Sequence, residues 1–228
     1  MQIDGILFDF GGTLDGDGLH WLDRFCALYP RLGFSFERET IRAAFDFAEA
    51  EAARDHAMQT TGLQEMVQRH VRSQFAKLAI DNPEARRALV TEFAENVRRA
   101  AHRNASLLQE LSQRGLRLGV ISNGCGNTAV LCDELGYSPY LATVLDSQRV
   151  GLSKPDPQFF SRASQEIGLP PARLLMVGDS LERDIRPAKQ IGMRTAWLNP
   201  NHDAGEKAAD IQISRLAELR DAVLRPVL

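Results

Sequence analysis

The sequence predicts an α/β fold, in which a doubly wound, mainly parallel sheet carries an inserted α-helical domain. Two observations lead to this fold class. At residues 3–9, and again after residue 104, short apolar runs are followed by helical segments, an alternation typical of a parallel sheet covered on both faces. Between these parts, residues 16–104 contain few Val and Ile residues, and their apolar positions recur at helical spacing.

The first predicted strand covers residues 3–9 and stops on the carboxylate of Asp9. The following residues 10–18, FGGTLDGDG, hold four glycines and two aspartates, so a loop is expected there. In open α/β sheets, ligands bind at the carboxyl ends of the strands. Asp9 is therefore placed where a functional carboxylate would lie.

Four amphipathic helices are predicted within the inserted segment, because its apolar residues form four separate stripes. The breaks between these helices are expected at residues 30–33, 60–62 and 81–83, which contain the turn formers Pro, Gly or Asn. The stripes consist of Leu22, Phe25, Cys26 and Tyr29; of Ile41, Ala44, Phe45, Ala48 and Ala52; of Met66, His70, Val71 and Phe75; and of Leu89, Phe93 and Val97.

After residue 104 the alternation of strands and helices resumes. Ser106 has the form of a capping-box start, so a helix is predicted to begin there and to end at Gly115. Further strands are predicted at residues 116–121, 142–145, 173–178, 194–198 and 210–213, with helices at 126–135, 157–167, 184–191 and 214–224. Right-handed crossovers place the carboxyl ends of the strands at one edge of the sheet. The core domain is thus expected at residues 1–15 and 105–228, and the helical domain at 16–104.

Composition and charge exclude several classes of function. With a net charge of -3 over 228 residues, the chain offers no electrostatic reason to bind nucleic acid or an anionic membrane. No apolar stretch is long enough to span a bilayer and residues 1–4 do not resemble a signal peptide, so a cytoplasmic location is expected. The expected assembly is a monomer or a homodimer. Cys26, Cys125 and Cys132 lack C-x-x-C spacing, and the five histidines lack H-E-x-x-H spacing, which argues against disulfides and zinc.

Asp9, Ser122, Lys154 and Asp179 each lie at or just beyond the carboxyl end of a predicted strand. Hydrolysis of a phosphate ester needs an in-line nucleophile and neutralisation of the charge on the phosphoryl oxygens. Asp9 is suited to attack phosphorus and to form an aspartyl-phosphate. Ser122 and Lys154 are suited to bind the phosphate, through a hydroxyl and an ammonium group.

Asp179 and Asp184 lie five residues apart across a strand-to-helix turn. Carboxylates, together with water and phosphate oxygens, are the ligands that Mg²⁺ prefers. The pair is therefore interpreted as a magnesium site, with capping of the helix at residues 184–191 as the alternative role of Asp184. Mg²⁺ would screen the repulsion between Asp9 and an anionic substrate.

The order and spacing of these motifs resemble the haloacid dehalogenase (HAD) superfamily, and the helical insert falls where that family places its C1 cap. The matching stretches are Asp9-Phe10-Gly11-Gly12-Thr13, Ser122-Asn123, Lys154 within GLSKPDP, and Gly178-Asp179-Ser180-Leu181-Glu182-Arg183-Asp184. The resemblance implies a Rossmann-like core and a small phosphorylated substrate. It also implies a Mg²⁺ site that is formed by Asp9, the backbone carbonyl of Gly11, Asp179 and Asp184. The phosphate-binding residues that it implies are Thr13, Ser122, Asn123, Gly124 and Lys154.

Gly11 departs from the family pattern. HAD phosphatases usually carry a second Asp there, which protonates the leaving group and later deprotonates the attacking water, a contribution of about 10²–10⁴-fold in rate. Asp15, Asp17 and His20 in the following loop, or a group of the cap, are candidate substitutes. Alternatively, the substrate has a good leaving group, as an acyl phosphate does, or the protein binds phosphorylated ligands and turns them over poorly.

Two other HAD branches also lack that Asp. The dehalogenases act without metal, and their fourth motif lacks the G-D-x-x-x-x-D form of residues 178–184. The phosphonoacetaldehyde hydrolases use Mg²⁺ but need a cap lysine that forms a Schiff base. Lys77 is the only lysine between residues 16 and 104, and its setting is that of a helix surface.

The helical cap would cover the site, exclude water and select the substrate. Its arginines are interpreted mainly as solvated helix faces, with one or two as candidates to meet an anionic substrate; they include Arg38, Arg42, Arg54, Arg69 and Arg72. Trp21 is a candidate substrate lid or a cap core residue. Cys125 is interpreted as a small packing residue near the phosphate.

Overall fold

Six parallel strands form one sheet within residues 3–200 and 208–224, the parts of the chain that this computed structural model describes. The strands are β1 (Gly5–Phe8), β2 (Arg117–Ser122), β3 (Leu141–Asp146), β4 (Leu174–Gly178), β5 (Arg194–Leu198) and β6 (Ile211–Ile213). The predicted fold class, a doubly wound parallel sheet with helices, is confirmed. The outermost residues of the predicted core domain, 1–2 and 225–228, and His202 lie outside the described residues.

The strand order β3-β2-β1-β4-β5-β6 reverses its direction of growth at β1. From β1 the chain first extends the sheet through β2 and β3, and it then returns to place β4 on the other side of β1. Such a switch point leaves a crevice outside the carboxyl ends of the two strands where the order reverses. Asp9 follows β1 directly, and its backbone N–H donates to the carbonyl oxygen of Val177 at 2.9 Å.

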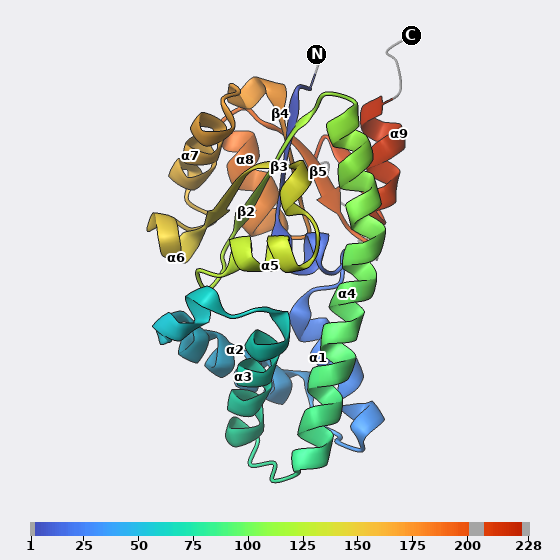
Figure 1. Cartoon of the computed structure of the whole chain (residues 1–228), viewed down its shortest axis with the longest axis vertical. Helices are drawn as coiled ribbons and strands as arrows, with labels where there is room; N and C mark the ends of the chain where they lie inside the picture. Colours follow the sequence, from blue (N-terminus) through green and yellow to red (C-terminus); the bar gives the residue numbers. More distant parts are fainter. Residues whose placement is uncertain (1–2, 201–207, 225–228) are drawn as a thin grey trace.

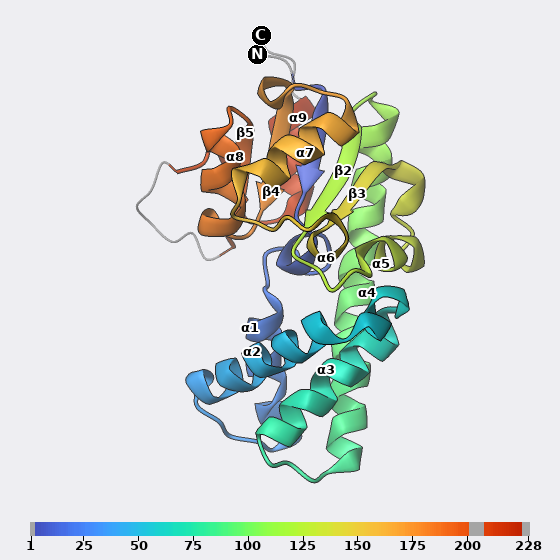
Figure 2. The ribbon, with the colours of Figure 1, turned by 90° about the vertical axis from the view of Figure 1, so that its left-hand side faces the viewer.

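Two helical layers cover the sheet, because successive side chains of a strand point to opposite faces. On β1, Leu7 belongs to one apolar cluster, and Ile6 and Phe8 belong to the other. The face of Leu7 is covered by α6 (Ser147–Val150), α7 (Pro157–Ile167) and α8 (Arg186–Gln190). The opposite face is covered by α4 (Pro83–Gln113), α5 (Thr128–Glu134) and α9 (Leu219–Leu224), as Figures 1 and 2 show.

The cap lies beyond the carboxyl edge of the sheet, in the lower half of Figure 1. It consists of α1 (Trp21–Leu28), α2 (Arg38–Arg54), α3 (Leu63–Lys77) and the first half of α4. The four predicted amphipathic helices are therefore confirmed, and short 3-10 turns at Pro30–Leu32 and His56–Thr60 lie between them. Aromatic rings fill the interior of the cap; the rings of Phe25 and Phe93, for example, stack with centroids 4.4 Å apart.

The helix start predicted at Ser106 is wrong. Helix α4 runs without interruption from the cap, along Pro83–Gln113, onto the face of the sheet. The side chain of Asn104 does not cap a helix but donates to the carbonyl oxygen of Leu14 at 2.8 Å, so it ties the helix to the loop after β1. The boundary expected between residues 104 and 105 therefore lies inside a continuous helix.

The loop predicted at residues 10–18 contains a wide turn at Phe10–Leu14, in which Gly11 and Gly12 have non-helical backbone angles. A similar turn at Leu181–Ile185 precedes α8, which begins two residues later than expected. The last helix, α9, begins at Leu219 rather than near residue 214, after a 3-10 turn at Leu216–Glu218. Within the described residues, no helix combines the length and apolar character that a membrane span requires.

Candidate active site

All but one of the predicted site residues line one cavity at the carboxyl edge of the sheet, between the core and the cap, and the exception is Thr13. Its volume is about 340 Å³. Asp9 enters it from the end of β1, Ser122 from the end of β2, and Asp179 from the end of β4. Lys154 reaches it from the loop before α7, and Asp184 from the turn before α8. The predicted convergence of these motifs is thus present in the structure.

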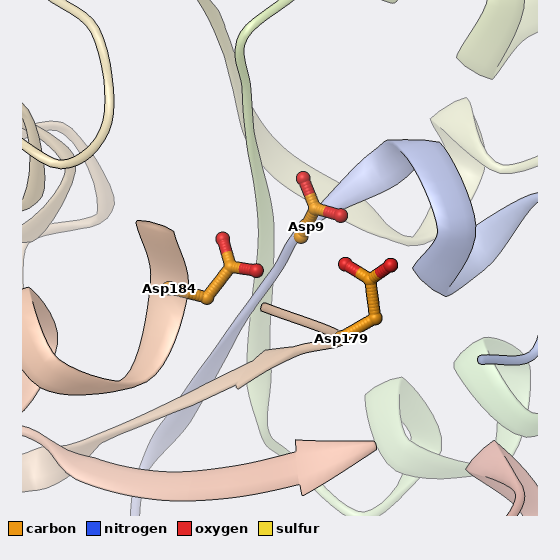
Figure 3. A group of neighbouring side chains, drawn as sticks. All are labelled: Asp9, Asp179 and Asp184. Atoms are coloured by element: carbon orange, nitrogen blue, oxygen red, sulfur yellow. The ribbon is translucent and has the colours of Figure 1, made fainter. Parts of the chain in front are cut away.

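Three carboxylates converge in this cavity from three separate segments, as Figure 3 shows. Asp9, Asp179 and Asp184 each offer an oxygen, and these oxygens lie within 4.8 Å of one another. Burial, followed by repulsion from the Asp9 charge, raises the pKa of Asp179 well above its usual range. Burial likewise raises the pKa of Asp184, to about 6. Such crowded negative charge fits a small divalent cation with oxygen ligands.

Glycine is required at two positions beside these carboxylates. Gly12 has φ +89°, and a side chain there would place its Cβ 2.4 Å from a carboxylate oxygen of Asp179. A Cβ on Gly178 would lie 2.4 Å from the carboxyl carbon of Asp184. The carbonyl oxygen of Asp179 is fixed by the indole N–H of Trp197 at 3.0 Å, a contact that sequence motifs did not indicate.

Lys154 links the nucleophile candidate to the acidic cluster. Its Nζ lies 2.5 Å from Asp9 Oδ1 and 2.7 Å from Asp184 Oδ1. Burial alone would lower the pKa of Lys154, but the charges of Asp184 and Asp9 raise it, so the ammonium stays protonated. The second oxygen of Asp9, Oδ2, accepts a hydrogen bond from Thr13 Oγ1 at 3.1 Å. The carboxylate of Asp9 is therefore held on both sides.

The loop after β2 is organised by Asp146, which sequence reasoning missed. Its carboxylate accepts hydrogen bonds from the backbone N–H of Gly126 at 2.9 Å and of Thr128 at 3.1 Å. A Cβ on Gly124 would lie 2.3 Å from this carboxylate, so the loop needs a glycine there. Asp146 thus shapes the segment that presents Ser122 and the following backbone to the cavity. Its position at the end of β3 was the available signal.

A family model for "haloacid dehalogenase-like hydrolase" matches residues 3–192, most of the chain. The chain belongs to this family of hydrolases. The resemblance inferred from the four motifs is thereby confirmed.

Relatives of this HAD-like hydrolase include several phosphatases. It is 32% identical to a phosphoserine phosphatase of Thermus thermophilus over 64% of this chain and 59% of the relative. It is 34% identical to a glyceraldehyde 3-phosphate phosphatase of Methanocaldococcus jannaschii over 51% of this chain and 53% of the relative. The matched regions thus span only a little over half of these two relatives. An N-acetylmuramic acid 6-phosphate phosphatase of Pseudomonas aeruginosa is 27% identical over 99% of this chain and 96% of its own length.

Solved structures show the same HAD fold along the whole chain. The L-2-haloacid dehalogenase RSc1362 superposes with a TM-score of 0.67 at 22% identity, over 99% of this chain and 100% of that one. A putative HAD-hydrolase, YfnB from Bacillus subtilis bound to magnesium, superposes with a TM-score of 0.61 at 19% identity, over 98% and 99% of the two chains.

Gly11 lines the cavity of this HAD-like hydrolase where the family's acid/base Asp usually stands. Two of the three predicted substitutes are engaged elsewhere. Asp15 is buried and accepts hydrogen bonds from the Gly12 N–H at 2.7 Å, from Arg24 at 2.8 Å and from the indole of Trp21. Asp17 accepts a hydrogen bond from the backbone N–H of Leu216 at 2.7 Å and does not line the cavity.

His20 is the loop substitute that does line the cavity. Its Nδ1 accepts the backbone N–H of Leu22 at 3.3 Å and so caps α1, and its Nε2 lies 3.4 Å from Arg183. Burial, then the charge of Arg183, lowers the pKa of His20 below its ordinary value. The neutral imidazole of His20 is therefore favoured at pH 7.

The basic residues predicted for the cap lie away from the cavity. The five arginines considered, Arg38, Arg42, Arg54, Arg69 and Arg72, are absent from its lining. Lys77 is also absent from the lining, and its Nζ lies 5.5 Å from the ring centroid of Phe47. Arg183 from the core does line the cavity, although its place within the fourth motif gave no indication of that role.

Trp21 and Cys125 both line the cavity wall. Trp21 is buried, with its ring 4.6 Å from that of Phe93 and its indole N–H donated to Asp15, so it is a fixed part of the cap interior. Burial, with smaller effects of Glu49 and Asp146, raises the pKa of Cys125 to about 12. The thiol is therefore protonated at neutral pH and unsuited to act as a nucleophile.

Proposed function

We propose that the protein hydrolyses a small phosphomonoester in a Mg²⁺-dependent reaction through an aspartyl-phosphate on Asp9. The observation that carries this proposal is the convergence of Asp9, Asp179 and Asp184 with the ammonium of Lys154 at the switch point of the sheet. The similarity to named phosphatases supports the same class of substrate.

In the first step an oxygen of Asp9 forms a bond to phosphorus as the bond from phosphorus to the substrate alcohol breaks. Lys154 and Ser122 face the same cavity and are assigned to the phosphoryl oxygens, together with the backbone N–H groups of Asn123 and Gly124. Thr13 orients the nucleophile through its hydrogen bond to Oδ2 of Asp9.

Mg²⁺, held by the carboxylates of Asp9, Asp179 and Asp184 and by the carbonyl of Gly11, would neutralise the charge between nucleophile and substrate. In the second step a water oxygen bonds to the phosphorus of phospho-Asp9, and the proton of this water passes to bulk solvent. The bond from phosphorus to Asp9 then breaks, which releases inorganic phosphate and restores the carboxylate.

Because Gly11 offers no acid, the rate of the reaction should depend strongly on the stability of the leaving group. An alcohol that leaves as a stable anion needs little protonation, so acyl and aryl phosphates should react faster than alkyl phosphates. A protein that binds phosphorylated ligands with almost no turnover is the alternative that Gly11 favours. Cleavage of a carbon–phosphorus bond through a Schiff base finds no support, because Lys77 does not line the cavity.

The test is turnover of p-nitrophenyl phosphate and acetyl phosphate, with Mg²⁺ and with a chelator. We expect Mg²⁺-dependent release of phosphate, reduced by at least about 10³-fold in Asp9→Asn. Asp133→Asn, an exposed aspartate on α5, is the matched control and should keep full activity. If the wild type and Asp9→Asn are equally inactive on both substrates, the phosphatase proposal is wrong and ligand binding becomes the leading function.

A further inference from the structure

A chain of buried hydrogen bonds runs through the cap and ends on a carboxylate in the cavity. The hydroxyl of Tyr29 donates to Oε1 of Gln74 at 2.9 Å, and Nε2 of Gln74 lies 2.8 Å from Nδ1 of His70. Nε2 of His70 then lies 2.9 Å from Oε1 of Glu49. Of these four residues, Glu49 and His70 line the cavity, and Gln74 and Tyr29 are completely buried behind them.

The order of donors along this chain fixes the roles of the atoms. Because Gln74 accepts the Tyr29 proton at its oxygen, its amide nitrogen is the donor toward Nδ1 of His70. Nδ1 is then an acceptor, so the ring proton is on Nε2, which donates to Glu49. The whole chain is therefore satisfied when Glu49 is an ionised acceptor.

The surroundings of His70 hold its ring in one orientation. The ring stacks on Phe25 with an interplanar angle of 2° and a centroid distance of 5.5 Å, and it also contacts the rings of Trp21 and Phe45. A buried histidine of this kind is ordinarily a satisfied member of an apolar core. Here its polar chain ends on Glu49, whose side chain is 45% exposed and lines the cavity. A carboxylate held in this way is preorganised to bind a ligand.

The residues that the cap contributes to the cavity lining also determine the charge on the cap side of the cavity. Helix α2 contributes Asp46 and Glu49, one helical turn apart, and none of the lining residues from the cap is an arginine or lysine. Burial would raise the pKa of Glu49, but the hydrogen bond from His70 is the largest effect in the opposite direction, and the pKa lies below its ordinary value. The cap side of the cavity is therefore acidic at neutral pH, whereas the core contributes the cations Lys154 and Arg183 to the same cavity.

We propose that Glu49, positioned by His70, binds hydrogen-bond donors on the alcohol part of the substrate, and that the cap side of the cavity rejects a second anionic group there. This inference rests on the proposed phosphatase function and adds its substrate class: phosphomonoesters of alcohols that carry hydroxyl or ammonium groups. A carboxylate binds both donors well and repels another carboxylate or phosphate.

A matched set of six-carbon phosphates tests the inference, since the cavity of about 340 Å³ has room for a ring of that size. The set comprises glucose 6-phosphate, glucosamine 6-phosphate, 6-phosphogluconate and n-hexyl phosphate, all primary alkyl esters. Each compound competes with p-nitrophenyl phosphate, so its affinity is measured even where its own turnover is slow. The two sugars differ in one hydroxyl or ammonium group, which distinguishes a polyol from an amine as the preferred partner.

We expect both sugars to bind at least about 10-fold more tightly than n-hexyl phosphate, and 6-phosphogluconate to bind more weakly than either sugar. In Glu49→Gln the preference for the sugars over n-hexyl phosphate should fall about 10- to 100-fold for the compound that Glu49 contacts. The relative affinity for 6-phosphogluconate should rise. Ratios within one variant cancel any general loss of activity.

Glu51→Gln is the matched control, because Glu51 lies on the same helix, is exposed and is absent from the cavity lining. It should keep the wild-type order of the four compounds. The inference is wrong if 6-phosphogluconate is preferred, or if Glu49→Gln and Glu51→Gln both keep the wild-type order. A wild type that never turns over p-nitrophenyl phosphate would instead overturn the proposed function, and the inference with it.

Discussion

Asn123 and Lys154 hold each other through two reciprocal hydrogen bonds, although 31 residues separate them in the chain. Nδ2 of Asn123 donates to the carbonyl oxygen of Lys154 at 2.8 Å, and the backbone N–H of Lys154 donates to Oδ1 of Asn123 at 2.8 Å. The side chain of Asn123 is thus occupied in fixing the backbone of the buried lysine. Only the backbone N–H of Asn123 is left for the phosphate role that the family resemblance implies.

Replacing Asn123 with Ala should therefore displace Lys154 from Asp9. We expect kcat/KM for p-nitrophenyl phosphate to fall by about 10- to 100-fold, because the ammonium no longer faces the nucleophile at a fixed distance. The free energy of unfolding should drop by about 1–3 kcal/mol, since two backbone groups lose their partner. Asn96→Ala, on the cap half of α4, is the control for both assays. Unchanged kcat/KM in Asn123→Ala would show that Lys154 is positioned without this pair.

Gly11→Asp should restore the missing acid. Gly11 has φ -75° and ψ 115°, which any residue adopts, and a Cβ built there meets nothing within 4 Å. We expect turnover of n-hexyl phosphate to rise by about 10²-fold or more, with less than about 10-fold change for p-nitrophenyl phosphate, whose leaving group needs little protonation. Gly11→Asn has the same shape without the acid and should give no such gain. Equal gains in the two variants would contradict a proton-transfer role.

The substitution Asp15→Asn should lower the free energy of unfolding, and its effect should not be confined to the reaction rate. Asp15 and Arg24 are almost completely buried and paired at 2.8 Å, and Nη1 of Arg24 already lacks a partner among the described residues. Removing the carboxylate charge leaves a buried guanidinium unpaired, which costs about 3–5 kcal/mol in urea unfolding. The exposed pair of Asp23 and Arg38 is the control, and Asp23→Asn should cost under about 1 kcal/mol. If Asp15→Asn is fully stable but inactive, this account is wrong and Asp15 is again a candidate for the acid/base.

The metal-free protein should lose stability as the pH rises from about 4 to 6. The pKa of Asp184 is about 6 in the folded protein, chiefly because of burial, and about 3.9 in an unfolded chain. Between these values the folded state holds a proton that the unfolded state has released. Stability from this group is therefore complete below about pH 4 and is lost as the pH passes 6.

Urea unfolding in a chelator, at several pH values, measures this effect as the difference between wild type and Asp184→Asn. We expect the wild type to lose on the order of 2 kcal/mol relative to the variant across this interval. Added Mg²⁺ should reverse the trend in the wild type, because the ion binds ionised carboxylates. A difference that grows with pH would show that Asp184 is not protonated in the metal-free site.

The sheet and the motif positions were predictable because each depends on local patterns. Apolar runs that end in Asp9, Ser122 or Asp179 mark strand ends, and parallel topology brings strand ends together. The continuity of α4 was not predictable in this way. Ser106 and Gln109 imitate a capping box, but good helix formers on both sides keep the helix unbroken through them.

The cap side of the cavity was harder to predict, because its contacts join residues far apart in sequence. His70 lies in an apolar stripe, where a pattern indicates only burial, and its partner Glu49 is on another helix 21 residues earlier. Arg183 lies within the fourth motif, but nothing in the sequence indicated the direction of its side chain. The pairing of such groups depends on how the helices pack, which is set by the whole cap.

Helix α4 spans about 46 Å, with its first half packed in the cap and its second half on the sheet. The number of residues in α4 therefore sets the angle between the cap and the core about the axis of this helix. One residue inserted between the halves would turn the cap by about 100° and lift it by about 1.5 Å, which carries Glu49 away from Asp9. A seven-residue insertion would nearly restore the angle but separate the cap and the core by about 10 Å. If Glu49 selects the substrate as proposed, the length of this one helix is a determinant of that selection.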